Sequence, residues 1–306
     1  MTALERLGPL PATTGAPYLV TTGVDRRAVA VEVTADASVT VVEMTVHGRW
    51  SEQLGGQVAD AVRLCLAGPT RAIIIDLRDV GDLHGSSLPF WAAAARSARL
   101  APIPARLALC LPPGTMLDHR LRHTEAGVPR AFPTMAEARI VLAGPLVRTH
   151  RRMQGRLPAH PRSVRAARDL VARACQAWQL NRIRHDAALV MSELAANAVE
   201  HAGTDAVATV VGDGSRLHLA VRDGDTRYPR FTERKSGQLG RSLGERGRGL
   251  RLVHAVAVAW GAMPARGGKV VWATVSPQTG PALGAGLDSR EPGDAGPPGG
   301  VPTGTG

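Results

Sequence analysis

The stretch Met191-Ser-Glu-Leu-Ala-Ala-Asn-Ala-Val-Glu-His201 decides the fold of the C-terminal half of the chain. Glu193 and Asn197 lie four residues apart within its apolar helical pattern. Residues at this spacing share one helix face, so a carboxylate and a carboxamide lie one turn apart. A carboxylate can accept a proton, and an amide oxygen can bind a hard cation such as Mg²⁺. Both residue types also occur on solvated helix faces, so the pair alone leaves a surface interpretation open.

A second feature is Arg222-Asp-Gly-Asp225, which follows an expected β-hairpin. The hairpin is indicated by apolar runs at Val207–Val211 and Leu217–Val221 around Gly212-Asp-Gly214. An Asp at a strand end can accept a hydrogen bond from an exocyclic amine, and Gly lets the backbone approach a flat ring. An ordinary Asp-Gly turn is the alternative interpretation.

A third feature is the glycine-rich segment Gly244-Glu-Arg-Gly-Arg-Gly-Leu-Arg-Leu-Val253. Gly244, Gly247 and Gly249 precede an apolar helix, so backbone N–H groups at the helix start are free to hold a phosphate. Arg248 either meets that phosphate or stays in solvent. The three features in this order, from helix pair to Asp-Gly loop to glycine-rich segment, together predict a nucleotide site.

Residues 157–276 resemble the GHKL ATP-binding fold, and specifically the actinobacterial branch of the anti-sigma factor type of serine/threonine kinase. The opening Leu157-Pro-Ala-His-Pro-Arg-Ser-Val and the closing Gly267-Gly-Lys-Val-Val-Trp-Ala-Thr-Val275 carry the resemblance together with the three motifs. The resemblance implies an α+β two-layer sandwich that binds ATP and Mg²⁺. It implies that Glu193 is the general base and Asn197 the Mg²⁺ ligand.

The same resemblance assigns the remaining site residues. Asp223 would contact the adenine amine with Gly224 beside it, and Thr274 would approach the adenine from the last strand. Gly247 and Gly249 would lie in the lid over the phosphates. One departure is that the superfamily prefers Asp-x-Gly-x-Gly at the adenine loop, and Asp225 replaces the first of those glycines.

The first half of the chain has strands and helices in alternation, which predicts a small α/β domain over residues 38–145. Its last helix opens with the capping box Thr134-Met-Ala-Glu137 and is expected to end at Gly144-Pro145. The expected strands and the other helices are Val39–Val46, Glu52–Ala67, Ile73–Leu77, Leu88–Leu100 and Leu107–Leu111.

This half resembles a STAS domain, the fold of anti-sigma factor antagonists. The resemblance rests on Val41-Val-Glu-Met-Thr-Val-His-Gly48, on Ile73-Ile-Ile-Asp-Leu77, and on the late helix with Glu137. In that family a serine in the loop after the Asp-Leu strand is phosphorylated by the partner kinase. The corresponding loop here is His84-Gly-Ser-Ser87. Counted from Val80, the acceptor position falls on Gly85; a shift of one residue makes Ser86 the candidate acceptor, and the preceding Asp is replaced. A STAS-like module that is never phosphorylated is the alternative.

Two domains are thus expected, with three connecting or terminal segments. Residues 1–37 read as a flexible lead-in with a short strand near Ala28–Val33, and residues 146–156 as a basic linker. The tail at 277–306 is rich in Gly and Pro and is expected to be disordered, because it has too little apolar surface to bury.

Composition narrows the functional classes. The 306 residues carry a net charge of +11, but the basic residues are scattered and without aromatic interleaving, so direct nucleic-acid binding is not expected. Three unclustered cysteines argue against a disulfide framework or a zinc site and fit a reducing cytoplasm. No apolar run approaches the roughly 20 residues that span a bilayer. A cytoplasmic protein that does not contact membranes is predicted.

The leading functional hypothesis is an ATP-dependent serine/threonine kinase that acts on a separate anti-sigma factor antagonist and so controls a sigma factor. The alternative is a binding module that holds nucleotide and sequesters its partner, an antagonist or a sigma factor, without phosphoryl transfer. Self-phosphorylation at Ser86 is a third idea, and the sequence leaves a homodimer open.

Overall fold

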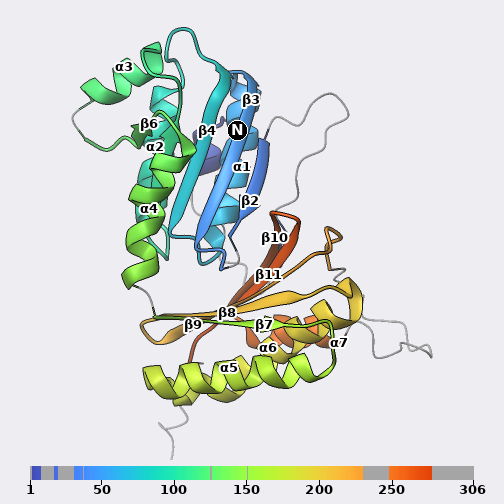
Figure 1. Ribbon diagram of the computed structural model, residues 1–306. Helices are drawn as coiled ribbons and strands as arrows, with labels where there is room; N and C mark the ends of the chain where they lie inside the picture. The colour runs from blue at the N-terminus through green and yellow to red at the C-terminus, as the bar shows by residue number, and fades with distance from the viewer. Residues whose placement is uncertain are drawn as a thin grey trace, which may run out of the picture.

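One mixed sheet of 11 strands runs through the chain and joins two units (Figure 1). The strand order is β6-β5-β4-β3-β2-β10-β11-β9-β8-β7, and β1 pairs with β10 beside that path. The computed structural model describes residues 2–7, 17–19, 31–36, 38–124, 126–149, 151–229 and 248–277, with the backbone alone at 17, 19, 143–149 and 248.

The N-terminal unit is an α/β layer structure. In this unit β2 pairs antiparallel with β3, and β4, β5 and β6 follow parallel to β3. Helices α1, α2 and α3 pack on one face, and α4 covers the other. The elements are η1 (Glu5–Leu7), β1 (Pro17–Leu19), β2 (Val31–Ala35), β3 (Val41–Arg49), α1 (Glu52–Ala67), β4 (Ala72–Gly81), α2 (Leu88–Leu100), β5 (Arg106–Cys110), α3 (Met116–His123), β6 (Arg130–Phe132) and α4 (Met135–Thr149).

Local signals placed the helices of this unit well. The observed α1 and α2 have the bounds expected from the sequence. Ser51 caps α1 by accepting a hydrogen bond from the Leu54 N–H at 3.2 Å. Half of the expected Thr134–Glu137 capping box forms, because the Glu137 N–H donates to Thr134 Oγ1, while the Thr134 hydroxyl and not its backbone N–H donates to Glu137 Oε1. The short elements α3 and β6 were not predicted, because eight and three residues give little periodicity to read.

The C-terminal unit has an antiparallel sheet with helices on one face. Figure 1 shows α5, α6 and α7 beneath this sheet, and their buried side chains form one core with its lower face. The elements are β7 (Arg151–Leu157), α5 (Arg162–Trp178), η2 (Asn181–Ile183), α6 (Arg184–Asn197), η3 (Ala198–Ala202), β8 (Ala206–Asp213), β9 (Arg216–Asp223), α7 (Arg248–Val256), β10 (Ala259–Ala265) and β11 (Gly268–Val275). The α+β two-layer arrangement expected of residues 157–276 is therefore present.

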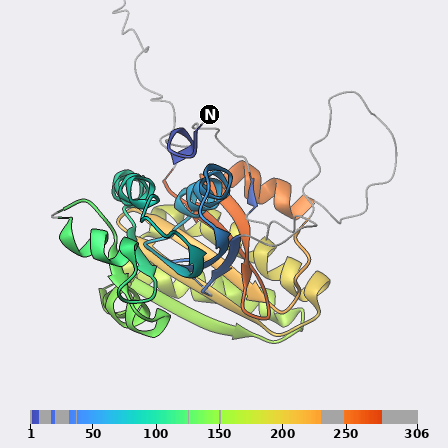
Figure 2. The ribbon, with the colours of Figure 1, turned by 90° about the horizontal axis from the view of Figure 1, so that it is seen from above.

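The upper face of this sheet packs against the N-terminal unit (Figure 2). Trp272 of β11 is fully buried there and stacks on Tyr18, with ring centroids 6.3 Å apart. Arg71 forms an ion pair with Asp213 at 2.7 Å across the same junction. The two units therefore share a hydrophobic core as well as a sheet, and a separate N-terminal domain is not what the structure shows.

Three predictions about connecting segments need correction. Residues 146–156 are no linker: α4 continues past Gly144-Pro145 to Thr149, and β7 then pairs along its whole length with β8. Part of 1–37 is ordered, since η1, β1 and β2 lie in it, and the expected short strand is Val31–Ala35. Of the tail 277–306, all but Pro277 lies outside the described residues. The pairing of β7 is a contact between distant residues, which local sequence signals do not contain.

Candidate functional site

Glu193 and Asn197 lie on α6, which packs against β9 and β11. The apolar side chains on one face of this helix are buried beneath the sheet. Glu193 and Asn197 are only partly exposed to solvent. Burial raises the pKa of the Glu193 carboxyl, and the nearby Glu200 carboxylate raises it further. A carboxylate with a raised pKa is a stronger proton acceptor, which suits a general base.

Asn197 stands where α6 changes into a π-helical turn, η3. Its amide nitrogen is buried and has no hydrogen-bond partner among the described residues. A buried polar group without a partner costs about 1–3 kcal/mol, so a ligand that accepts a hydrogen bond from this N–H group would be favoured. Single π turns also occur frequently at functional sites. The Asn197 carboxamide is therefore available to a ligand.

The first turn of α7 lies against Glu193. A Cβ atom added to Gly249 would overlap Glu193 Oε2, so a larger residue at this position would force the Glu193 carboxylate to turn away. The N-terminus of a helix carries partial positive charge and free N–H groups that attract anions. The expected glycine-rich start of α7 is thus brought next to the predicted base.

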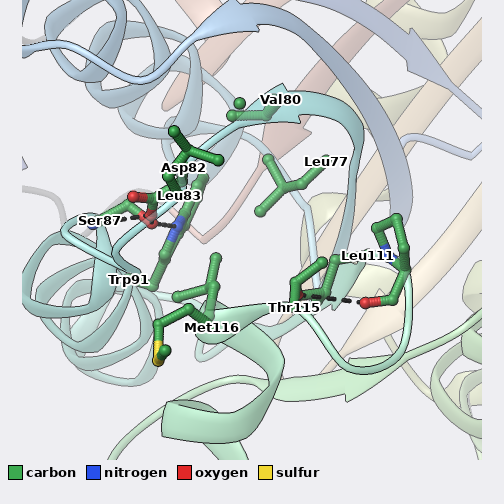
Figure 3. Close-up of a pocket in the computed structure, with 12 residues that line it drawn as sticks. Leu77, Val80, Asp82, Leu83, Ser87, Trp91, Leu111, Thr115 and Met116 are labelled. Carbon is green, nitrogen blue, oxygen red and sulfur yellow. Dashed lines mark hydrogen bonds between the residues drawn. The ribbon is translucent and has the colours of Figure 1, made fainter.

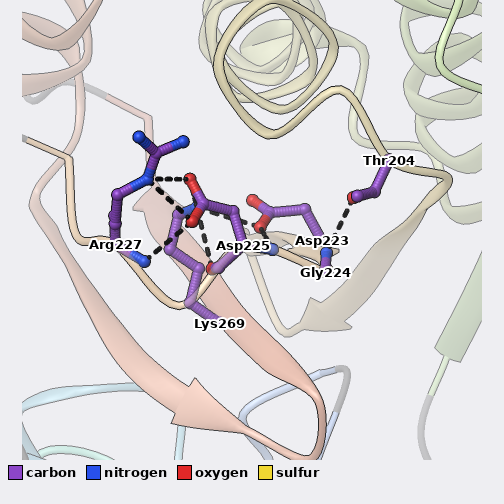
Figure 4. A network of polar contacts seen from close by, with 6 residues as sticks. All are labelled: Thr204, Asp223, Gly224, Asp225, Arg227 and Lys269. Atoms are coloured by element: carbon purple, nitrogen blue, oxygen red, sulfur yellow. Dashed lines mark hydrogen bonds and ion pairs between the residues drawn. The ribbon is translucent and has the colours of Figure 1, made fainter.

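Asp223 ends β9 and is 4% exposed. Lys269 of β11 is its neighbour across the sheet and donates to Asp223 Oδ1 at 2.9 Å (Figure 4). The Asp225 N–H donates to the same oxygen at 2.9 Å. Among the described contacts Oδ2 receives neither bond, so it is the oxygen left to a further donor such as an exocyclic amine.

The loop after Asp223 is tied to the end of the Asn197 helix. The Gly224 N–H donates to Thr204 Oγ1 at 2.9 Å, and a Cβ on Gly224 would come within 3.1 Å of that oxygen. Asp225 pairs with Arg227, whose Nε lies 3.1 Å from Asp225 Oδ1, and also with Lys269 of β11, whose Nζ lies 3.7 Å from Asp225 Oδ2 (Figure 4). The Arg227 hydrogen bond lowers the pKa of Asp225, so this carboxyl is ionised. The hydrogen bond between Gly224 and Thr204 therefore connects the loop after Asp223 with the segment that follows the Asn197 helix.

Asp223 and the helix motif lie on the same side of the sheet. The side chains of Leu217, Leu219 and Val221 point toward the helices, and Asp223 continues that alternation. The structure therefore gathers Glu193, Asn197, Asp223, Gly224 and Gly249 on the helix-covered face of β9 and β11.

Thr274 is not brought to this site. It lies five residues along β11 from Lys269, about 17 Å at about 3.4 Å per residue. It also shares the sheet face of Trp272, which looks toward the N-terminal unit, and its Oγ1 bonds His218 Nδ1 at 2.8 Å. Burial lowers the pKa of His218 to about 4, so this pair is neutral at pH 7. Thr274 therefore lies apart from the other predicted site residues, because strand alternation puts it on the other face of the sheet.

Part of the predicted site lies beyond what the structure describes. Gly244 and Gly247 are outside the described residues, and for Arg248 the backbone alone is described, as the first residue of α7. Lys269 and Thr204 were missed by sequence reasoning. Lys269 stands in the closing Gly-Gly-Lys motif, but only the β9–β11 register reveals its partner. Thr204 carries no local signal.

The candidate acceptor Ser86 lies in the N-terminal unit, in the loop between β4 and α2. It is exposed, and its hydroxyl donates to Asp82 Oδ1 at 2.9 Å. Asp82 also accepts from the backbone N–H groups of Ser86 and Ser87 and from the Ser87 hydroxyl. Ser87 in turn accepts from Trp91 Nε1 at 2.9 Å. The hydroxyl of Ser86 is therefore engaged in closing this loop.

Comparison with protein families gives an independent assignment for one part of the chain. Residues 157–275 match the family described as histidine kinase-like ATPase domain. Residues 157–275 are thus similar to a histidine kinase-like ATPase domain, a class that suggests ATP binding, typically with Mg²⁺. No curated protein matches the chain.

The search for membrane-spanning segments was negative. No helix among the described parts of the chain is both long enough and apolar enough to cross a bilayer.

Proposed function

We propose that this protein is an ATP-dependent serine/threonine kinase of the anti-sigma factor type. The observation that carries the proposal is Glu193, a partly buried carboxyl with a raised pKa that lies against the start of α7. On the same helix one turn later, Asn197 has a buried amide nitrogen without a partner among the described residues, and its amide oxygen is of the type that binds Mg²⁺. The proton acceptor and the polar ligand therefore lie on one rigid element.

The residues of this site fit a Mg²⁺ nucleotide. Among the described residues no cluster of three His, Cys, Asp or Glu side chains could hold a metal by itself, so the nucleotide must supply most of the ligands. Asn197 would contribute one oxygen, and the first turn of α7 would face the phosphates. The bound nucleotide supplies the phosphoryl group, and its metal ion screens the phosphate charge.

The role of Glu193 follows from its position and pKa. It would accept the proton of a serine hydroxyl on the partner protein as that oxygen attacks. Gly249 keeps the space in front of the carboxylate free, because any larger side chain would fill it. Asp223 would accept a hydrogen bond from the adenine amine of the nucleotide through Oδ2. Its other oxygen, Oδ1, accepts hydrogen bonds from Lys269 and from the Asp225 N–H.

The partner in this proposal is a separate anti-sigma factor antagonist, whose phosphorylation would control a sigma factor in the cytoplasm. The N-terminal unit supports a regulatory role, because its order of elements from β2 to α4 agrees with the STAS-like interpretation. It is an unsuited substrate, because the Ser86 hydroxyl already donates to Asp82 and the expected acidic neighbour is absent. A sensing or docking role that involves no phosphorylation is therefore proposed for this unit.

A second candidate is a nucleotide-binding module that sequesters its partner without phosphoryl transfer. The observation that favours it is the buried ion pair of Asp223 with Lys269. In this ion pair the carboxylate that would recognise adenine is already bound to a side chain of the protein itself. Asp225 in place of the family's glycine points in the same direction.

The experiment that separates these functions uses the full-length chain, labelled ATP, Mg²⁺ and candidate antagonist proteins. The Glu193→Gln variant should transfer label to the antagonist at least about 100-fold more slowly while binding nucleotide normally. The Ser86→Ala variant is the control and should transfer label as the wild type does.

Each outcome has one meaning. Nucleotide binding without label on any antagonist would favour the sequestering module. Label on the chain itself that is lost only with Ser86→Ala would favour self-phosphorylation. A wild-type chain that binds no ATP would overturn the kinase proposal.

A further inference from the structure

A cavity of about 240 Å³ lies in the N-terminal unit, far along the chain from the ATPase domain. It opens at the carboxyl ends of β4 and β5, between the start of α2 and the start of α3 (Figure 3). Ligands in α/β sheets bind preferentially at this edge, just outside the ends of the parallel strands. Neither the family match nor the proposed kinase chemistry uses this cavity, since the match begins only at residue 157.

The wall of the cavity is predominantly apolar. Leu77, Leu111 and Leu117 are buried and line it together with Trp91. Two large apolar side chains at the same cavity are exposed to solvent, Leu83 at 74% and Met116 at 47%. Exposed apolar side chains beside a hollow are typical of a binding site. A molecule held in the cavity would cover part of both.

The polar groups of the wall already have partners. Each oxygen of Asp82 accepts two hydrogen bonds, from the N–H and hydroxyl of Ser86 and of Ser87. Thr115 Oγ1 donates to the Pro112 carbonyl and accepts from the Asp118 N–H. Figure 3 shows the Ser87 and Trp91 groups directed at one another. A polar ligand would therefore find few free donors or acceptors in this wall.

The charge of the wall restricts the ligand further. Although burial raises the pKa of Asp82, the hydrogen bonds from Ser87 and Ser86 outweigh it and leave the pKa below its usual value. Asp82 is thus an anion at neutral pH and repels an anionic ligand. The volume sets the size, because an engineered apolar cavity of about 150 Å³ already takes up benzene.

We propose that this cavity binds a small, neutral, apolar molecule of about one substituted aromatic ring. Such a ligand would contact Leu83 in the loop of Ser86 and Met116 in the first turn of α3 at the same time. The occupied cavity would therefore hold α3 and this loop together. This would make the N-terminal unit a sensor of a small molecule, independently of whether the C-terminal domain transfers phosphate.

The test measures binding of benzyl alcohol and of benzoate to the full-length chain by calorimetry and by methyl NMR shifts. Benzyl alcohol should bind and shift the methyl signals of Leu77, Leu111 and Leu117, whereas benzoate should bind at least about tenfold more weakly because of Asp82. Val80→Phe fills the cavity from its half-buried edge and should weaken benzyl alcohol binding at least about tenfold. Val258→Phe makes the same change at an exposed position of the other unit and should bind as the wild type does.

Several results would overturn the proposal. One is the absence of binding of benzyl alcohol, toluene and indole to the wild-type chain. Another is equal binding of benzyl alcohol by Val80→Phe and Val258→Phe, which would place the probe elsewhere. Equal binding of benzoate would refute the requirement for a neutral ligand. If Val80→Phe does not fold, as judged by its thermal unfolding, Met116→Trp covers the mouth from an exposed position and takes its place.

Discussion

Two polar clusters of this protein, one in each unit, differ in how well their hydrogen bonds are satisfied. Around Asp82 every carboxylate oxygen has two donors, and the loop is closed by its own side chains. Around Glu193 and Asn197 a carboxyl is held with a raised pKa, and a buried amide nitrogen has no partner among the described residues.

This difference in hydrogen bonding distinguishes a cluster that stabilises the fold from a cluster that can bind a ligand. A satisfied network stabilises the fold and leaves few donors or acceptors for a polar ligand, whereas unsatisfied groups destabilise the fold and favour a ligand that satisfies them. The Asp82 cluster is therefore interpreted as a structural element. The Glu193 and Asn197 cluster is interpreted as a site.

The largest expected effect comes from removing the unsatisfied amide. Asn197→Leu should weaken Mg²⁺–ATP binding about 100-fold, since it removes the proposed metal ligand. The same change should raise the free energy of unfolding by about 1 kcal/mol, because a buried group without a partner disappears. Calorimetric titration and urea unfolding measure the two quantities. Asn181→Leu, at an exposed position of η2, is the control, and a loss of stability in Asn197→Leu would contradict the comparison.

The opposite result is expected at the satisfied cluster. Asp82→Ala should lower the free energy of unfolding by about 2 kcal/mol, because it leaves the N–H groups of Ser86 and Ser87 without their acceptor. Nucleotide affinity should not change. Asp79→Ala removes an exposed carboxylate of the same unit and should change stability by less than about 0.5 kcal/mol. An effect of Asp82→Ala on nucleotide affinity as large as that of Asn197→Leu would show that the two clusters are not distinct.

A smaller effect is expected where α7 meets the base. Gly249→Ala places a methyl group on Glu193 Oε2, so the carboxylate must turn away and phosphoryl transfer should fall about tenfold. Transfer rates with saturating ATP measure this. Gly155→Ala is the matched change, because its added Cβ would meet only Leu170 at an ordinary 3.6 Å. Equal rates in the two variants would mean that Glu193 does not act in the geometry described.

The smallest effect concerns pH. The pKa of Glu193 is raised, first by burial and then by Glu200, and the proposed base must be ionised. The acidic limb of the rate profile should therefore lie above pH 4.5, the ordinary value of this carboxyl, and activity should be lost as the pH falls through the raised pKa.

Glu200→Gln tests this directly. It removes one of the two causes, so the limb should move to lower pH by a fraction of a unit. Glu52→Gln, an exposed change in α1, should leave the limb in place. A shift to higher pH, or an equal shift in both variants, would contradict the assignment of Glu193 as the base.

Much of the fold could be read from local patterns. The helices Glu52–Ala67 and Leu88–Leu100 follow from the periodicity of their apolar residues. The first of them also has Ser51 as its cap at the start and Gly68 at its end. All of these signals lie within or next to the helix itself. The β8–β9 hairpin follows from Gly214, whose φ of +56° suits a glycine at the turn. In the site, Glu193 with Asn197 and Asp223 with Gly224 were found in the same way. The spacing of each pair is set by a single helix or turn.

The predictions that differ from the structure depend on contacts between residues far apart in the sequence. Thr274 was assigned to the site because it belongs to the closing motif, but the alternation of β11 puts it on the opposite face, with His218. Lys269 was overlooked, although the register of β9 and β11 makes it the partner of Asp223. The expected linker contains strand β7, because Arg151–Leu157 pair with strand β8.

By itself the sequence determined most of the longer helices and strands and the residues with the proposed chemistry, because helix periodicity, caps and turns act within a few residues. Only the tertiary structure decided that the two halves share one sheet through β2 and β10, with Trp272 buried between them. It also decided that Glu193 faces Gly249 and that Asp223 is paired with Lys269. Such contacts depend on strand register and on the burial of shared surface, which form only when distant parts of the chain fold together.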